Sequence, residues 1–223
     1  MKKYALFIIC FIVQFTNAQE VTINLNDFSV VKVYDRINVT LVAAKENKIV
    51  IKGTKANDVE VINKGKDLKI RMKFSKLLKG ENIEATVYYK NIEGLEASEG
   101  SFISSNNTFK ATAFSLNAKE GSVIKVTLDV HKLKSKANSG GELEIEGKAA
   151  NHDATITSGG IIKAKNLITA QTDVSVNAGG EAKVNATDFV EAKTRAGGSI
   201  DVYGNPKQVN QKTVAGGSIT VMD

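Results

Sequence analysis

The chain has few of the residues on which catalytic and metal sites depend. Of its 223 residues, one is cysteine, one is proline, two are histidine and none is tryptophan. Cys10 lies in an apolar N-terminal stretch, so the rest of the chain can form no disulfide and support no thiol catalysis. His131 and His152 have no cysteine or acidic cluster at metal-ligand spacing. We therefore predict no metal site, and we expect both histidines to be ordinary polar loop residues.

Short motifs of common catalytic and nucleotide sites are also missing. The Ser-Gly-Gly segments at 139–141 and 158–160 are turns and not nucleophile elbows, which require Gly-x-Ser-x-Gly. The glycine pair at 140–141 precedes a strand-like segment with three glutamates, so it does not form a phosphate loop. No catalytic residue and no cofactor are predicted, and the chain is not expected to be an enzyme.

The N-terminus has the pattern of a secretory signal peptide. Lys2 and Lys3 precede an apolar run over 5–13, and small residues at Thr16 and Ala18 suit a signal peptidase. We predict a signal peptide over 1–18, cleaved between Ala18 and Gln19. The run is too short for a stable membrane span, and no later segment approaches one.

The residues before Cys10 are large, which excludes a lipoprotein signal. The protein is therefore expected in the periplasm, at the cell surface or in the medium. Removing residues 1–18 takes away two lysines and no acids, which lowers the formal net charge from +6 to +4. This charge is not concentrated in a basic run, so nucleic acid is excluded as a partner. Weak attraction to anionic envelope polymers stays open.

Residues 19–92 are predicted to form an N-terminal β region. Near-absent helical periodicity and the single proline, Pro206, favour an all-β chain. Two pairs of apolar segments, 39–42 with 49–51 and 59–62 with 68–72, flank short polar turns. Such short connections predict antiparallel hairpins.

A doublet built on glycine then recurs seven times at intervals of 18 to 21 residues. A fixed period of about 19 is the signature of a solenoid. Residues two and four places after each doublet, and three and five before it, are mostly apolar, which predicts two short strands per unit. Inward side chains at equivalent positions would stack into one continuous core.

We thus predict a right-handed parallel β-helix of about seven short coils over 93–223, packed with the N-terminal region as one continuous unit. Glycine suits the corner between the two strands of a coil, because it tolerates positive φ and close backbone approach. The glycines predicted to shape the corners are Gly100, Gly121, Gly140, Gly141, Gly159, Gly160, Gly179, Gly180, Gly197, Gly198, Gly216 and Gly217.

This pattern resembles the putative auto-transporter adhesin, head GIN-domain family of bacterial envelope proteins. The resemblance rests on the strands at 28–31 and 68–70, the serial glycine corners, and above all the closing stretches 197–206 and 216–219. The corners are mostly Gly-Gly where the family commonly has Gly-Ser-Gly, and Lys90-Asn91 stand where it commonly has proline. The resemblance implies a β-solenoid at the cell envelope.

Three functions are compatible with these features. The first is an exported, non-catalytic, adhesin-like module that binds an envelope or host polysaccharide or a surface protein. The second is a self-associating structural or envelope-sensing element, a homo-oligomer formed through the C-terminal edge, because no cap follows the last strand at 218–222. No ligand-binding residue is predicted, since the late aromatic residues Phe114, Phe189 and Tyr203 form no ladder.

The third and least favoured function is a polysaccharide-cleaving solenoid enzyme. Glu142, Glu144 and Glu146 share one strand face, with Glu181 stacked two coils later, and glycoside hydrolysis uses two such acids. Neighbouring outward positions carry lysines, among them Lys163, so this face is interpreted as charge-alternating solvated surface.

Overall fold

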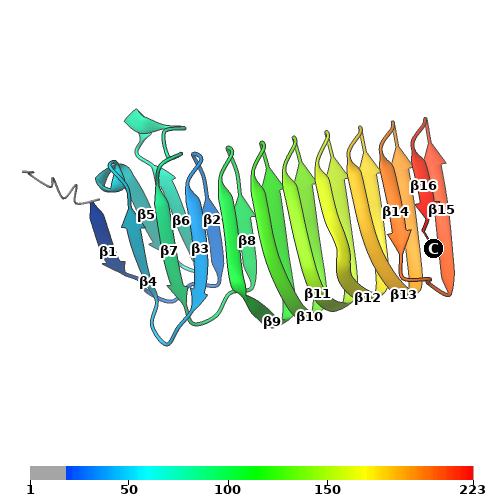
Figure 1. The fold of residues 1–223 in the computed structure, drawn as a ribbon, viewed down its shortest axis with the longest axis horizontal. Coiled ribbons are helices and arrows are strands. Elements are labelled where there is room, and N and C mark those ends of the chain that lie inside the picture. Colours follow the sequence, from blue (N-terminus) through cyan, green and yellow to red (C-terminus); the bar gives the residue numbers. More distant parts are fainter. Residues whose placement is uncertain (1–18, 223) are drawn as a thin grey trace, which may run out of the picture.

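The structure is a computed structural model that describes residues 19–222; the predicted signal peptide and Asp223 lie outside the described residues. The described residues form sixteen strands and two short 3-10 turns, arranged as an elongated flattened coil (Figure 1). None of the helical segments in residues 19–222 has the length and apolarity needed to cross a membrane.

The elements before the repeats are short. They are β1 (Glu20–Asn24), β2 (Val30–Val33), β3 (Asn38–Ala43), β4 (Lys48–Lys52), η1 (Ala56–Asp58), β5 (Val59–Lys64), β6 (Asp67–Met72), η2 (Phe74–Lys76), β7 (Glu84–Tyr89) and β8 (Gly94–Ala97). The repeat elements are β9 (Phe102–Lys119), β10 (Val123–Asn138), β11 (Glu142–Thr157), β12 (Ile161–Asn177), β13 (Glu181–Arg195), β14 (Ser199–Tyr203), β15 (Gln208–Val214) and β16 (Ser218–Val221).

The strands lie on two faces of the coil. The first face runs β1-β4-β7-β3, continues through the first halves of β9 to β13, and ends with β14 and β16. The second face runs β5-β6-β2-β8, continues through the second halves of β9 to β13, and ends with β15. Each long strand therefore starts on one face and bends onto the other (Figure 1).

Successive coils pair in parallel register at the predicted period. Val123 pairs with Glu142, which pairs with Ile161, at 19-residue steps along the first face. Bulges occur where β11, β12 and β13 bend, so the step there varies. The predicted all-β fold with a parallel solenoid of about seven turns is confirmed.

The N-terminal region departs from simple hairpins. The predicted hairpin of 59–62 with 68–72 forms as β5 and β6. The one predicted between 39–42 and 49–51 is wrong, because β7 lies between β3 and β4. β3 is itself a coil strand, and its parallel neighbours β7 and β9 occupy both of its edges. The coil formed by β2 and β3 thus lies between two other coils, one formed by β6 and β7 and the other by β8 and β9. Its place in the stack therefore differs from its place in the chain.

Each coil turns from the second face to the first at a tight corner, and the corners form one edge of the molecule (Figure 1). At the corner before β12, Ser158 and Gly159 both have positive φ, 50° and 75°, and Gly160 N–H donates to the Thr157 carbonyl. This is the arrangement of a type I′ turn. Gly160 follows with its Cα against the preceding coil, where a Cβ would overlap the Ala137 carbonyl.

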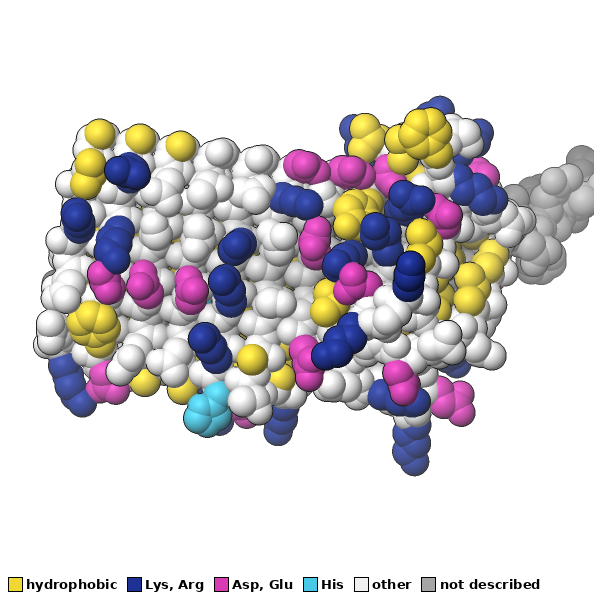
Figure 2. Space-filling view, turned by 180° about the vertical axis from the view of Figure 1, so that it is seen from behind, with side chains coloured by type: hydrophobic (Ala, Val, Ile, Leu, Met, Phe, Trp, Pro, Cys, Tyr) yellow, Lys and Arg dark blue, Asp and Glu magenta, His cyan; other side chains and the backbone are white. Residues whose placement is uncertain are grey.

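All seven predicted corners share a non-glycine residue with positive φ directly before the doublet. These residues are Glu99, Glu120, Ser139, Ser158, Ala178, Ala196 and Ala215. An eighth corner joins β2 to β3 through Asp35 and Arg36, with φ of 60° and 63°, and contains no glycine. In Figure 2 the edge changes accordingly from acidic near the N-terminal end to polar and then alanine.

One narrow core fills the space between the two faces. Its buried side chains run from Phe28 to Val202 as a single cluster. Large residues such as Ile37, Leu41 and Met72 fill the N-terminal part, whereas alanines such as Ala164 and Ala192 are frequent in later coils. The parallel register of successive coils places the outward side chains of neighbouring strands in regular rows.

Candidate functional site

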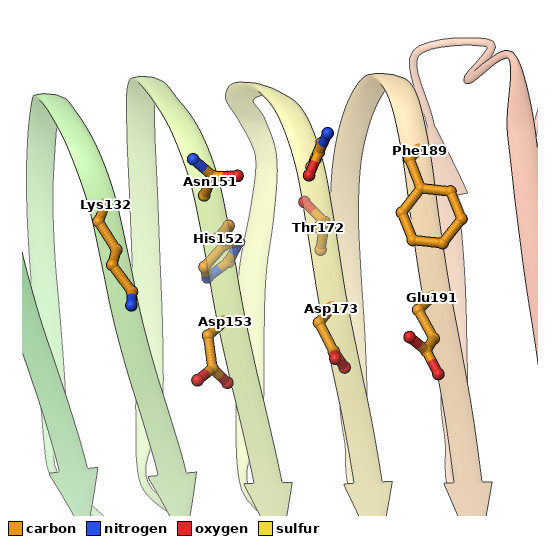
Figure 3. Close-up of a pocket in the computed structure, with 9 residues that line it drawn as sticks. Lys132, Asn151, His152, Asp153, Thr172, Asp173, Phe189 and Glu191 are labelled. Carbon is orange, nitrogen blue, oxygen red and sulfur yellow. The ribbon is translucent and has the colours of Figure 1, made fainter.

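A shallow groove of about 250 Å³ crosses the second face over β10 to β13 (Figure 3). Its lining residues come from four consecutive coils: Lys132, Asn151, His152, Asp153, Gln171, Thr172, Asp173, Phe189 and Glu191. These residues lie just after the point at which each strand bends from the first face to the second. Register shifts in the β11–β12 and β12–β13 pairings directly precede these residues.

Three carboxylates form a row along the groove. Asp153 pairs in register with Asp173, which pairs with Glu191. Adjacent strands lie about 4.8 Å apart, so the side chains stand at that interval and point outward (Figures 2 and 3). Lys134 continues the row on β10, next to Asp153. The row therefore combines concentrated negative charge with a cation at one end.

The middle carboxylate is electrostatically distinct. Partial burial raises the pKa of Asp173, and the charges of Glu191 and Asp153 raise it further, while Lys193 opposes them. Lys193 itself forms an ion pair with Glu191. A carboxyl group between two others holds a proton more readily than an isolated one.

The floor of the groove contains a buried histidine. His152 shares a 2.7 Å hydrogen bond with the Ser135 hydroxyl, and its burial lowers its pKa to about 4. The imidazole is therefore neutral at pH 7. The prediction of a polar loop residue is wrong for His152, which points inward from the second half of β11, where residues 152, 154 and 156 are buried in alternation. His131 is exposed but lies within β10, so for it the polar character is correct and the loop assignment is wrong.

The remaining lining groups flank the carboxylate row. Asn151, Gln171 and Phe189 pair in register two residues earlier on the same three strands, with Lys132 beside Asn151. The half-exposed ring of Phe189 forms one end of this second row (Figure 3). The groove thus places one aromatic face beside two amides, three carboxylates and an ammonium group.

The family model of the putative auto-transporter adhesin, head GIN domain matches residues 27–206. The chain belongs to this family. That match confirms the relationship suggested by the glycine corners and by the stretch at 197–206.

Solved structures of similar fold include a putative adhesin from Bacteroides fragilis, with 18% identity, a TM-score of 0.84, and coverage of 92% of this chain and 98% of that one. A putative adhesin from Parabacteroides distasonis has 20% identity, a TM-score of 0.73 and coverage of 91% and 96%. A structure described as a putative lipid binding protein from the same organism has 16% identity, a TM-score of 0.70 and coverage of 93% and 98%. At such identities the likeness concerns the fold alone. A comparison with curated proteins found no match.

The glutamates considered for hydrolysis lie on the opposite, first face of this GIN-domain chain. Glu144 is held between Lys125, at 3.2 Å, and Lys163, at 3.4 Å. Its hydrogen bond to Lys125 lowers its pKa, although partial burial opposes this. A general acid needs a raised pKa, so the arrangement gives no support to Glu144 as the acid of such a pair. Glu142 also pairs with Lys163.

The corner glycines of this family member lie on the edge and contribute nothing to the groove. The groove residues were not predicted from the sequence, although a signal was present. Asp153, Asp173 and Glu191 each stand six residues before the first glycine of the following doublet. Aligning the repeats on their corners and comparing outward positions would have placed the three acids in one row.

Proposed function

We propose that this protein is an exported, non-catalytic, adhesin-like module that binds carbohydrate in the groove over β10 to β13. The family supports an adhesin-like role at the envelope or outside the cell. The observation that carries the ligand class is the groove itself, in which Phe189 lies beside rows of amide and carboxylate groups. Sugar rings offer apolar C–H faces to aromatic rings and hydroxyl groups to such acceptors and donors.

The open shape of the groove suits a polymer better than a small molecule. Catalytic sites and tight small-molecule sites are usually deep and enclosed. A row of equivalent groups at strand spacing instead offers repeated weak contacts along a chain, and several copies at a surface would multiply them. We propose an envelope or host polysaccharide as the polymer.

A glycan array tests this proposal, with the processed chain beginning at Gln19 as the probe. We expect binding of a polysaccharide class, weakened about two- to tenfold by Phe189→Ala, since a stacked aromatic contact contributes on the order of 0.5–1.5 kcal/mol. Tyr203→Ala is the matched control, because Tyr203 is another half-buried aromatic residue but lies on the first face. Equal losses in both variants would contradict the assignment of the groove.

The same samples test for turnover. Incubation with the bound polysaccharide should leave its chain length unchanged, since the proposed role is binding alone. Shortened products that disappear with Asp173→Asn would overturn the non-catalytic assignment and place hydrolysis in the groove. Shortened products that disappear with Glu144→Gln would place it on the first face instead.

Self-association is a second candidate function, favoured by the end of the solenoid. Within the described residues, β15 pairs only with β13 and β16 only with β14, so each leaves one edge unpaired. Val214 and Val221 are exposed there. Such edges can pair with a second copy. Light scattering over a concentration series would reveal an oligomer, and Val221→Lys should dissociate it if β16 forms the contact.

A further inference from the structure

One coil has no tight corner. The longer connection that takes the place of this corner is the most apolar projection of the described surface. Between β6 and β7 the chain makes an excursion over residues 73–83, which includes η2 and stands above the row of corners (Figure 1). Phe74, Leu77 and Leu78 are exposed there by 88%, 44% and 45%. The other large apolar side chains exposed within residues 19–222, such as Ile168, are scattered singly. We call residues 73–79 the apolar loop.

The apolar loop is held in a defined conformation. The buried carboxylate of Asp35 accepts hydrogen bonds from Met72 N–H at 3.0 Å and from Leu78 N–H at 2.8 Å, which ties both ends of the loop to the β2–β3 corner. Gly80 N–H donates to the Asp35 carbonyl. Leu78 has a φ of 58°, a costly conformation for a leucine that anchoring of this kind can maintain. The loop is therefore built to keep its apolar side chains outside the core.

Its charge is uniformly positive. Lys73, Lys76 and Lys79 alternate with the apolar residues, and residues 73–79 contain no acid. Among the ion pairs of the described residues, none involves these three lysines. Lys73 instead donates to the Asn57 carbonyl. Figure 2 shows hydrophobic side chains surrounded by basic ones at the same projection.

We propose that the apolar loop inserts into the surface of an anionic phospholipid bilayer. Aromatic and leucine side chains partition into the interfacial region, and flanking lysines contact lipid phosphates while their alkyl chains stay apolar. Glu99 and Glu120, which line the hollow beside Leu77 and Leu78, repel such a surface. Contact is thereby confined to the tip of the loop, and the groove over β10 to β13 stays free.

Because the chain has no tryptophan, Phe74→Trp installs a single reporter at the tip. The experiment uses the processed chain from Gln19, since an uncleaved apolar segment would itself bind lipid. On addition of phosphatidylcholine vesicles containing phosphatidylglycerol, the emission should shift to shorter wavelength and be quenched by brominated lipid. Ile168→Trp, a reporter at an exposed apolar position (56%) outside the loop, should show neither change.

Charge and apolar contributions are then separated. Replacing the three lysines by glutamine should weaken vesicle binding by about fivefold per lysine contacting the surface, and added salt should act in the same direction. In the Phe74→Trp protein, the double substitution Leu77→Ser and Leu78→Ser should abolish the spectral shift of the tryptophan. It should leave the thermal melting temperature unchanged, because both leucine side chains are exposed. Vesicles of phosphatidylcholine alone should bind weakly.

Several results would overturn the proposal. These are an absence of binding to anionic vesicles, binding that survives the loop substitutions, and a spectral shift that a soluble polyanion or self-association reproduces without lipid. Glycan binding through the groove is measured separately and should be unaffected by the loop variants, so failure of one proposal leaves the other intact.

Discussion

The neutral histidine beneath the groove makes a quantitative prediction about acid stability. His152 has a folded-state pKa of about 4, against about 6.5 in an unfolded chain. The unfolded state therefore binds a proton at higher pH than the folded state, so acidification favours unfolding. The contribution of His152 is fully present above about pH 7 and is lost as the pH falls towards 4.

The size of this effect follows from the two pKa values. Between pH 7.5 and pH 4.5 the linkage removes about 2.5 kcal/mol from the free energy of unfolding. For a chain of this length that corresponds to about 5–10 °C in melting temperature. His152→Leu removes the titration but leaves the Ser135 hydroxyl without its partner, at a pH-independent cost of about 1–3 kcal/mol.

Equilibrium unfolding in urea at a series of pH values measures the prediction. The stability advantage of the parent over His152→Leu should shrink by about 2.5 kcal/mol from pH 7.5 to pH 4.5. Carboxylates near the groove titrate in both proteins, so their contribution cancels in this difference. His131→Gln, which removes an exposed histidine on the neighbouring coil, is the matched control. A constant difference between the parent and His152→Leu across this range would refute the reasoning.

Two further predictions concern the corners and the N-terminus. Gly159→Val should cost about 1–3 kcal/mol through its positive φ, because its surroundings are open. Gly160→Val should cost more through overlap with the preceding coil, and Lys163→Thr, on the exposed first face, less than about 0.5 kcal/mol. Thermal melts of the three variants would contradict this register if they coincided. Mass spectrometry of envelope material should give an N-terminus at Gln19, and a retained, lipid-modified Cys10 would disprove the predicted cleavage.

Much of the architecture follows from local chemistry that a sequence displays. The glycine corners recur because two adjacent residues with positive φ are needed where a coil turns, and glycine at the second of them costs least. The β2–β3 corner escaped prediction because Asp35 and Arg36 adopt the same conformation without glycine. Its strain is offset by the two backbone hydrogen bonds of the Asp35 carboxylate, a long-range contact that no repeat alignment contains.

Pairing between distant strands was harder to predict. Short polar connections favour hairpins, and the β5–β6 hairpin obeys this rule. β3 does not, because the stacking of coils brings β7 and β9 to its edges and leaves no place for β4. The groove was missed for a similar reason. Asp153 and Asp173 are unremarkable within their own segments and become a site only when parallel register places them side by side.

The out-of-order coil has a mechanical consequence. From the C-terminal end, each coil contacts essentially only its neighbours, so a pulling force should peel coils away one at a time, each releasing about 65 Å of extended chain. Peeling stops where the β2–β3 coil lies clamped between strands that follow it in the chain. There the force must shear several strands at once. An adhesin-like rod with this end fixed would lengthen stepwise under load, yet keep its N-terminal end folded to the last.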